Sequence, residues 1–337
     1  MIEDVQEIWG LLEASGPSMD QFRVREVMNI ELVAGRILLG LDNHHHRHLL
    51  IPVPQNTRLV TDRRSSGVQI VAHPLVDAGT LRTFVDLVCL KPHLQEMFSI
   101  LVNEVLEMLK KNSSQPDQTC HQVLQRWREL LERDPSNLVG IEKLVGVFGE
   151  LWFLREVTQR NPSAVQYWIG PRGSRHDFAF GTLAVEVKST LSRRGRFVEI
   201  HGLQQLEAPE NGHLFLAVLE FEQLPTSGES LRELVESIVS LGGDRYTLLN
   251  LLAQVDVSLL TLDAYNDISF RVYESRIYEV KDGFPRITSD SFTEGTLPKG
   301  VIKLTYQIDL SIEPPAPLNG GAVEKLYTEL DAEMKML

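Results

Sequence analysis

The stretch HDFAFGTLAVEVKST, residues 176–190, decides how this chain is interpreted. It contains two short β-prone runs, 176–180 and 183–189, which are separated by Gly181-Thr182. Apolar and β-branched runs on either side of a short turn that contains glycine are typical of a hairpin. The sequence therefore predicts two antiparallel strands joined by a tight turn.

Three charged side chains are expected to meet on this hairpin. Side chains alternate between the two faces of a strand, so Glu186 and Lys188 share one face and Val185 and Val187 share the other. Asp177 lies on the preceding strand, close enough for its carboxylate to lie beside that of Glu186. Two carboxylates and one ammonium group then converge at one place.

Such a pair of carboxylates favours a divalent cation. Neighbouring carboxylates repel one another, and neither loses its hydration readily near a sheet core unless a cation neutralises them. Mg²⁺ or Mn²⁺ accepts oxygen ligands and keeps waters and phosphate oxygens as further ligands. Lys188 could orient or deprotonate a metal-bound water or contact a phosphoryl oxygen. This arrangement predicts cleavage of phosphodiesters.

A buried helix is predicted upstream of the hairpin. Residues 138–158, LVGIEKLVGVFGELWFLREVT, are apolar on nearly every side, as in helices inside a domain. Gly146 and Gly149 lower helix propensity, which suggests close packing against another backbone. Glu150 projects from a largely apolar face, and a buried carboxylate needs a partner or a metal.

These features resemble the PD-(D/E)XK nuclease superfamily. The resemblance rests on Asp177 followed after eight residues by Glu186-Val187-Lys188, downstream of the helix that carries Glu150. FGELWFLRE at 148–156, W-x-GP at 168–171 and LQQL at 203–206 resemble, more closely, the bacterial PD-(D/E)XK motif proteins associated with phage-defence loci. One departure is His176, which replaces the proline before the motif aspartate.

The resemblance implies a fold and a set of site residues. The fold is α/β, with a restriction-endonuclease-like core in which helices flank a central mixed sheet, plus a β-rich N-terminal domain. The implied metal ligands are Asp177, Glu186 and Glu150, and Lys188 is the implied catalytic lysine. Gln204 or Gln205 matches the glutamine that often follows the motif, and we select Gln204. The implied activity is that of a Mg²⁺- or Mn²⁺-dependent DNA endonuclease in a restriction or phage-defence system.

Other interpretations remain open. Glu186 and Lys188 could form an ion pair on an exposed strand, which contributes little to stability, while Asp177 ends a turn. The fold could also be kept without cleavage, as a scaffold that binds DNA or a partner protein. An RNA or nucleotide phosphodiesterase is a third alternative.

A cluster of arginines flanks the motif on both sides. Clustered arginines suit contacts with the phosphate backbone, whereas the alternative is a solvated loop. They supply no base-reading code, so no sequence specificity is predicted. The cluster comprises Arg172, Arg175, Arg193, Arg194 and Arg196.

Composition limits the class of protein. A net charge of −13 over 337 residues excludes a uniformly basic nucleic-acid coat but allows a local basic face. Two cysteines without metal-ligand spacing, no secretory signal and no apolar run of about 20 residues predict a soluble cytoplasmic protein without a membrane segment. There is no phosphate-binding loop, so any ATP-driven translocation requires a partner ATPase or another defence protein. A double-strand break needs two cuts, which favours a homodimer acting on DNA.

The chain is expected to fold in four parts. These are a β-rich N-terminal domain (1–90), a helical connector (91–136), the nuclease-like core (137–260) and a C-terminal β segment with a helix that packs on the core (261–337). Adjacent histidines in the DNHHHRH segment point in different directions in a hairpin loop, so we interpret them as a solvated loop and leave them out of the site. They are His44, His45, His46 and His48.

Overall fold

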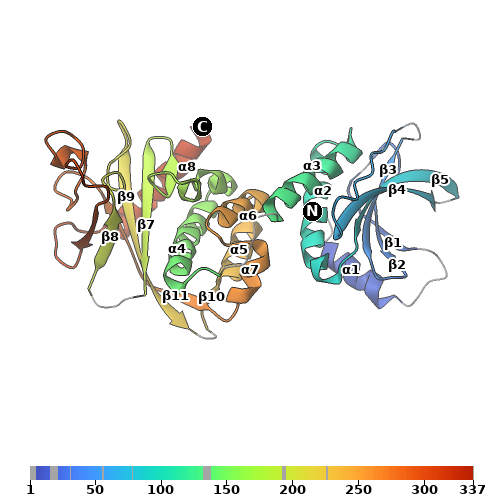
Figure 1. Cartoon of the computed structure of the whole chain (residues 1–337), viewed down its shortest axis with the longest axis horizontal. Coiled ribbons are helices and arrows are strands. Elements are labelled where there is room, and N and C mark those ends of the chain that lie inside the picture. Colours follow the sequence, from blue (N-terminus) through green and yellow to red (C-terminus); the bar gives the residue numbers. More distant parts are fainter. Residues whose placement is uncertain are drawn as a thin grey trace. The chain divides into compact units, whose positions relative to one another are not determined.

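The computed structural model describes residues 5–15, 22–30, 32–54, 57–77, 79–131, 138–191, 195–224 and 227–336. The chain divides into two compact units, Met1–Glu132 and Arg133–Leu337, and each is described by itself. Figure 1 labels the elements of both.

The first unit contains a five-stranded antiparallel sheet in the order β1-β2-β3-β5-β4. Its strands are β1 (Phe22–Glu26), β2 (Leu38–Asp42), β3 (Arg47–Val53), β4 (Val68–Asp77) and β5 (Thr80–Cys89). Its helices are α1 (Val5–Ala14), η1 (Pro92–Leu94), α2 (Gln95–Lys111) and α3 (Pro116–Leu131), so the helices expected in a connector belong to this unit. Every residue of β3 is buried.

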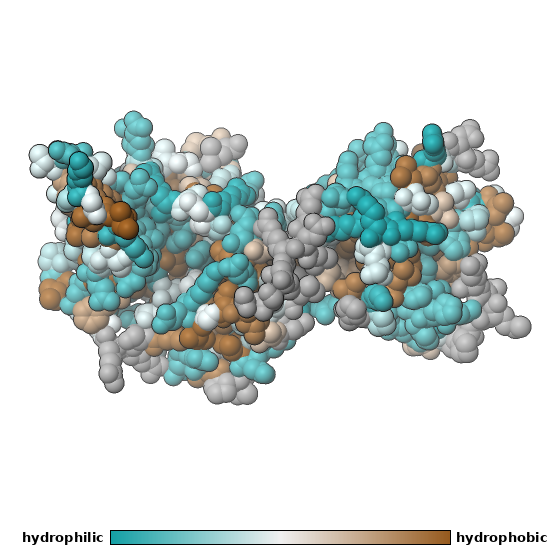
Figure 2. Space-filling model, in the orientation of Figure 1, coloured by the Kyte–Doolittle hydropathy of each residue, from teal (hydrophilic) through white to brown (hydrophobic). Residues whose placement is uncertain are grey.

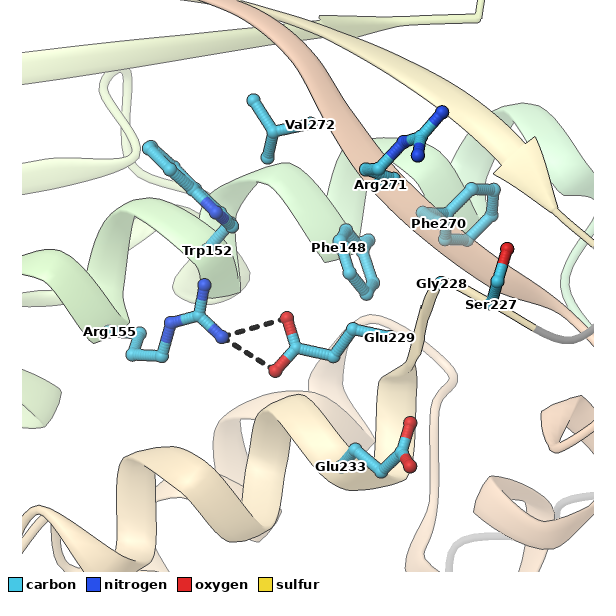
Figure 3. Close-up of a pocket in the computed structure, with 10 residues that line it drawn as sticks. All are labelled: Phe148, Trp152, Arg155, Ser227, Gly228, Glu229, Glu233, Phe270, Arg271 and Val272. Carbon is cyan, nitrogen blue, oxygen red and sulfur yellow. Dashed lines mark hydrogen bonds and ion pairs between the residues drawn. The ribbon is translucent and has the colours of Figure 1, made fainter.

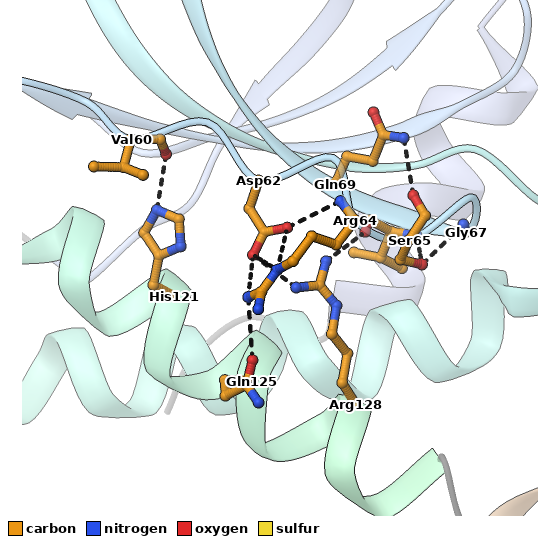
Figure 4. A network of polar contacts seen from close by, with 10 residues as sticks. Val60, Asp62, Arg64, Ser65, Gly67, Gln69, His121, Gln125 and Arg128 are labelled. Atoms are coloured by element: carbon orange, nitrogen blue, oxygen red, sulfur yellow. Dashed lines mark hydrogen bonds and ion pairs between the residues drawn. The ribbon is translucent and has the colours of Figure 1, made fainter.

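Residues 59–61, between β3 and β4, form no strand. Their segment is held against α3 by polar contacts around the buried Asp62 (Figure 4). Asp62 accepts hydrogen bonds of 2.7 Å from both Arg64 and Arg128, and the ring of His121 contacts the carbonyl of Val60 at 2.9 Å. Hydrogen bonds from Arg64 and Arg128 hold the pKa of Asp62 well below its usual range despite burial.

The histidine segment is only partly a solvated loop. His44 and His45 are exposed in the turn between β2 and β3. His48 lies inside β3, where it is 5% exposed and its Nδ1 is 2.9 Å from the carboxylate of Asp86. The expectation of a solvated loop is therefore wrong for His48. The strand β3 already begins at Arg47, and all of its residues are buried.

The second unit is built on a mixed sheet in the order β10-β11-β9-β7-β6, in which β7 and β9 are parallel and the other pairs antiparallel. A mixed sheet was expected for the core. Its strands are β6 (Phe178–Phe180), β7 (Leu183–Thr190), β9 (His213–Leu224), β10 (Glu229–Ser230) and β11 (Ser269–Glu279).

Different elements cover the two faces of this sheet (Figure 1). On one face, Phe148 of α4 packs edge-on against Phe221 of β9. On the other, the two-stranded sheet β8 (Phe197–His201) and β12 (Thr305–Asp309) forms an apolar cluster that includes Ile200, Leu216 and Ile308. The helices are α4 (Ile141–Thr158), η2 (Pro162–Tyr167), η3 (Gly170–Arg172), α5 (Leu231–Ser240), α6 (Arg245–Gln254), α7 (Leu259–Leu262), η4 (Asp263–Tyr265), η5 (Ser289–Ser291) and α8 (Gly320–Met336).

The two glycines of α4 differ in their surroundings. A Cβ on Gly149 would collide with Ser189 Oγ of β7, whereas a Cβ on Gly146 would meet no atom within 4 Å. Gly149 is therefore closely packed, against the side chains of Ser189 and Phe221 rather than against another backbone, and among the described residues none packs closely on Gly146. Gly149 allows the helix to approach the strand that carries the acidic motif.

The visible surface of each unit carries apolar residues in separate groups among hydrophilic ones (Figure 2). None of the described helices is both long enough and apolar enough to cross a membrane. Both Cys89 and Cys120 are buried free thiols.

Candidate functional site

The hairpin of β6 and β7 brings the motif residues together. Phe178 pairs with Val185 across the hairpin, and Asp177 immediately precedes this pair along the chain. The Asp177 carboxylate accepts a 2.7 Å hydrogen bond from the backbone N–H of Val187. Lys188 Nζ lies 2.9 Å from Glu186 Oε1. Two carboxylates and one ammonium therefore converge, as the alternation along β7 predicts.

The segment after α4 fixes a third carboxylate beside them. The fully buried Trp168 donates a 2.7 Å hydrogen bond from Nε1 to Glu150 Oε2. The backbone N–H groups of Ile169 and Gly170 both donate to the carbonyl of Asp177, at 2.8 and 2.9 Å. These contacts connect the helix, the W-x-GP segment and the motif strand.

The close approach of the W-x-GP segment to Asp177 requires a glycine at position 170. A Cβ at this position would lie 2.8 Å from Asp177 Oδ1 and 3.4 Å from Glu150 Oε2. Sequence reasoning assigned no site role to Trp168 or Gly170. Both residues belong to the W-x-GP motif at 168–171, which supported the family resemblance. Only the fold shows which carboxylates they contact.

Burial makes the negative charge at this site unfavourable. It raises the pKa of Asp177 to about 6, against the opposing effects of the Val187 hydrogen bond and Lys188. Burial, followed by the charge of Asp177, raises the pKa of Glu186 to about 8, and Glu186 is only 2% exposed. The same two causes raise the pKa of Glu150 well above its ordinary value. A bound cation would favour the charged form of all three groups.

The donor set fits a hard divalent ion held by two carboxylates. Mg²⁺ is usually bound by one or two carboxylates together with waters and substrate phosphates. Asp177 and Glu186 supply such a pair. Within the described part of the chain, no three His, Cys, Asp or Glu side chains are placed to hold one ion together. Glu150 therefore does not complete a three-carboxylate set in this arrangement, and its Oε2 is bonded to Trp168.

Of the two candidate glutamines, the structure brings Gln205 to the lysine. Gln205 Oε1 accepts hydrogen bonds from Lys188 Nζ at 3.3 Å and from the backbone N–H of His201 at 2.8 Å. Gln204, which the sequence analysis selected, is exposed, and no hydrogen bond to Lys188 is found for it. The two glutamines lie in a turn after β8, so their sequence order alone could not identify the one that faces Lys188.

The structure separates the five arginines. Arg172 and Arg175 are exposed in the segment that leads into β6. Arg196 lies 3.6 Å from Glu274 of β11, so its charge is already paired. Arg193 and Arg194 lie outside the described residues.

His176 occupies the position of the proline in the motif. Its side chain is 3% exposed, and it forms a hydrogen bond with the backbone of Glu207, in the segment that carries the glutamines. Burial, together with the nearby charge of Arg175, lowers the pKa of His176 to about 4, so the ring is neutral at pH 7. The replacement therefore adds a contact between the motif strand and the glutamine turn.

One family model matches the chain. The family described as "Putative PD-(D/E)XK family member, (DUF4420)" matches residues 5–311. The searches of curated proteins and of solved structures gave no match.

Proposed function

The chain belongs to this PD-(D/E)XK family, and from that premise we propose that it is a Mg²⁺- or Mn²⁺-dependent endodeoxyribonuclease. The observation that carries the proposal is the convergence of Asp177, Glu186 and Lys188 on one hairpin. An exposed surface ion pair would not explain two neighbouring carboxylates whose pKa values are both raised by burial.

In the proposed mechanism, Asp177 and Glu186 hold the ion. When bound, the ion would lower the pKa of a coordinated water and offset the charge that develops on the phosphate. The Val187 hydrogen bond fixes one oxygen of Asp177, and Lys188 holds Glu186. Glu150, kept in place by Trp168, adds negative charge beside the pair and is proposed to strengthen cation binding.

Lys188 is the group proposed to act on the reacting atoms. Its ammonium lies between Glu186 Oε1 and Gln205 Oε1, which restricts the directions in which Nζ can point. From there it can orient the attacking water or donate a hydrogen bond to a phosphoryl oxygen. Gln205 acts through Lys188 by fixing its position.

The direct test is a cleavage assay on plasmid, linear and single-stranded DNA with Mg²⁺ or Mn²⁺. We expect the wild-type chain to cut at least one substrate, and Asp177→Asn, Glu186→Gln and Lys188→Met to lose about 100-fold or more of the rate. Glu324→Gln, which changes an exposed carboxylate of α8, is the matched control and should retain activity.

Two results would reject the nuclease assignment. Retained metal-dependent cleavage in all three motif variants would mean that these residues do not carry the activity. DNA binding without cleavage under every condition would favour the non-cleaving scaffold instead. If cleavage is found, we further propose a role in restriction or phage defence. The proposed partners are an ATPase of such a system or a second copy of this chain.

A further inference from the structure

The second unit has a polar cavity that is lined in part by Gln205, the residue that bonds to Lys188. It has a volume of about 400 Å³ and is lined mainly by Ser174, Arg175, His201, Gln204 and Gln205. These residues come from two segments, the loop before β6 and the end of β8 with the turn that follows it. The larger part of the lining carries groups that can donate hydrogen bonds.

Both segments are connected to the proposed catalytic residues. Arg175 precedes Asp177 by two residues on the same segment. Gln205 accepts hydrogen bonds from Lys188 and from the backbone of His201. A ligand in this cavity would therefore lie next to the position at which Lys188 is proposed to meet the phosphate.

The charge of Arg175 distinguishes this cavity from another one. The guanidinium of Arg175 is exposed, and no ion pair with a described residue is found for it. A cavity of about 590 Å³ between α4 and β11 also has two arginines, but both are paired with carboxylates, and Figure 3 shows the pair of Arg155 with Glu229. Arg155 contacts both oxygens of Glu229, at 2.6 and 2.7 Å, and Arg271 contacts Glu222 at 2.6 Å.

We propose that the cavity at Arg175 binds a phosphate of the substrate strand next to the one that is cleaved. This inference rests on the proposed nuclease function and assigns a substrate subsite to it. Arg175 supplies the positive charge, and the Ser174 hydroxyl and the Gln204 amide supply neutral donors. The ring of His201 lies 3.3 Å from the carboxylate of Glu199, so we assign the ring no contact with the phosphate. The backbone N–H of His201 instead helps to hold Gln205 in place.

The test is the steady-state kinetics of Mg²⁺-dependent cleavage of a duplex oligonucleotide at several salt concentrations. Arg175→Ala should raise KM about tenfold or more, since a charge-assisted hydrogen bond is lost, with a smaller change in kcat. The dependence of log kcat/KM on log salt should become less steep by about 0.9, the value for one phosphate contact. Arg175→Lys, which keeps the charge, should restore most of the loss.

Arg271→Ala is the matched control because it changes the net charge by the same amount away from this cavity. It should leave both KM and the salt dependence near the wild-type values. A normal KM and salt dependence in Arg175→Ala, in an enzyme that cleaves normally, would overturn the subsite alone. Absence of cleavage by the wild-type chain on every substrate would overturn the proposed function and the subsite with it.

Discussion

The carboxylate of Asp177 accepts a 2.7 Å hydrogen bond from the backbone N–H of Val187, the residue between Glu186 and Lys188. The aspartate is therefore fixed to the strand that carries Glu186 and Lys188. Asp177 directly precedes the three-residue strand β6, and the bond to the hairpin partner restrains the direction of its carboxylate.

Trp168→Phe should weaken the site while preserving the fold. The substitution removes the 2.7 Å hydrogen bond that holds Glu150 Oε2 and leaves that carboxylate with a higher pKa. We expect reduced Mn²⁺ affinity at pH 7, measured by calorimetry. Trp127→Phe is the matched control, since Trp127 makes a hydrogen bond of the same length to Glu104 in the first unit. Equal Mn²⁺ affinities in the two variants would contradict a role for Trp168 in the site.

Gly170→Ala should damage the site more than an ordinary surface substitution. The new Cβ would lie 2.8 Å from Asp177 Oδ1 and 3.0 Å from Asp177 Cα, so the aspartate must move. We expect loss of cleavage together with a lower melting temperature. Gly140→Ala, whose Cβ would meet no atom of the described residues within 4 Å, should change neither quantity appreciably. Full activity in Gly170→Ala would show that the position of Asp177 is not critical.

Gly149→Ala and Gly146→Ala should have opposite effects on the stability of the second unit. The added methyl at Gly149 collides with Ser189, so we expect a loss of about 1–3 kcal/mol in the free energy of unfolding. At Gly146 the space is open, and alanine should stabilise the helix by up to about 1 kcal/mol. Urea denaturation of both variants measures the difference. Similar changes of the same sign would contradict the close approach of α4 to β7.

The contribution of Asp177 and Glu186 to the stability of the metal-free chain should fall as the pH rises from about 4 to 8. The folded-state pKa values of Asp177 and Glu186, about 6 and about 8, are raised above their ordinary values. Their contribution to stability is therefore complete below about pH 4 and is lost as the pH rises through 6 and then 8. Calorimetric melting in EDTA should show this decline. Mg²⁺ should raise the melting temperature more at pH 8 than at pH 5, because it binds the ionised carboxylates.

The variant with both Asp177→Asn and Glu186→Gln provides the control for this pH dependence. It lacks the two titrating groups, so its melting temperature should change less between pH 4 and pH 8 and should not respond to Mg²⁺. The same decline in this variant as in the wild type would assign the pH dependence to other groups.

The sequence was sufficient to predict the features with strong local signals. Alternation along 183–189 predicted β7, and the apolar run at 138–158 predicted α4. Local patterns could not show the pairing of distant segments. The parallel pairing of β7 with β9 and the two-stranded sheet of β8 and β12 join segments whose spacing along the chain does not define their partners.

For the site, too, the local pattern was predictable from the sequence and the tertiary contacts were not. The D-x8-E-x-K spacing around a short turn predicted that Asp177 lies beside the strand that carries Glu186, and its hydrogen bond with Val187 agrees with this. The choice between Gln204 and Gln205 depends on the backbone of the turn after β8, and the role of Trp168 depends on how its loop returns to α4. Those are tertiary relationships, and no residue pattern in the chain encodes them locally.

The most direct measurement is calorimetric titration of Mn²⁺ into the wild-type chain and into Asp177→Asn and Glu186→Gln at pH 8. We expect one binding event per chain in the wild type and its loss in both variants, with circular dichroism spectra unchanged. Mn²⁺ binding of undiminished affinity in either variant, or none in the wild type at millimolar metal, would contradict a divalent ion held by these two carboxylates.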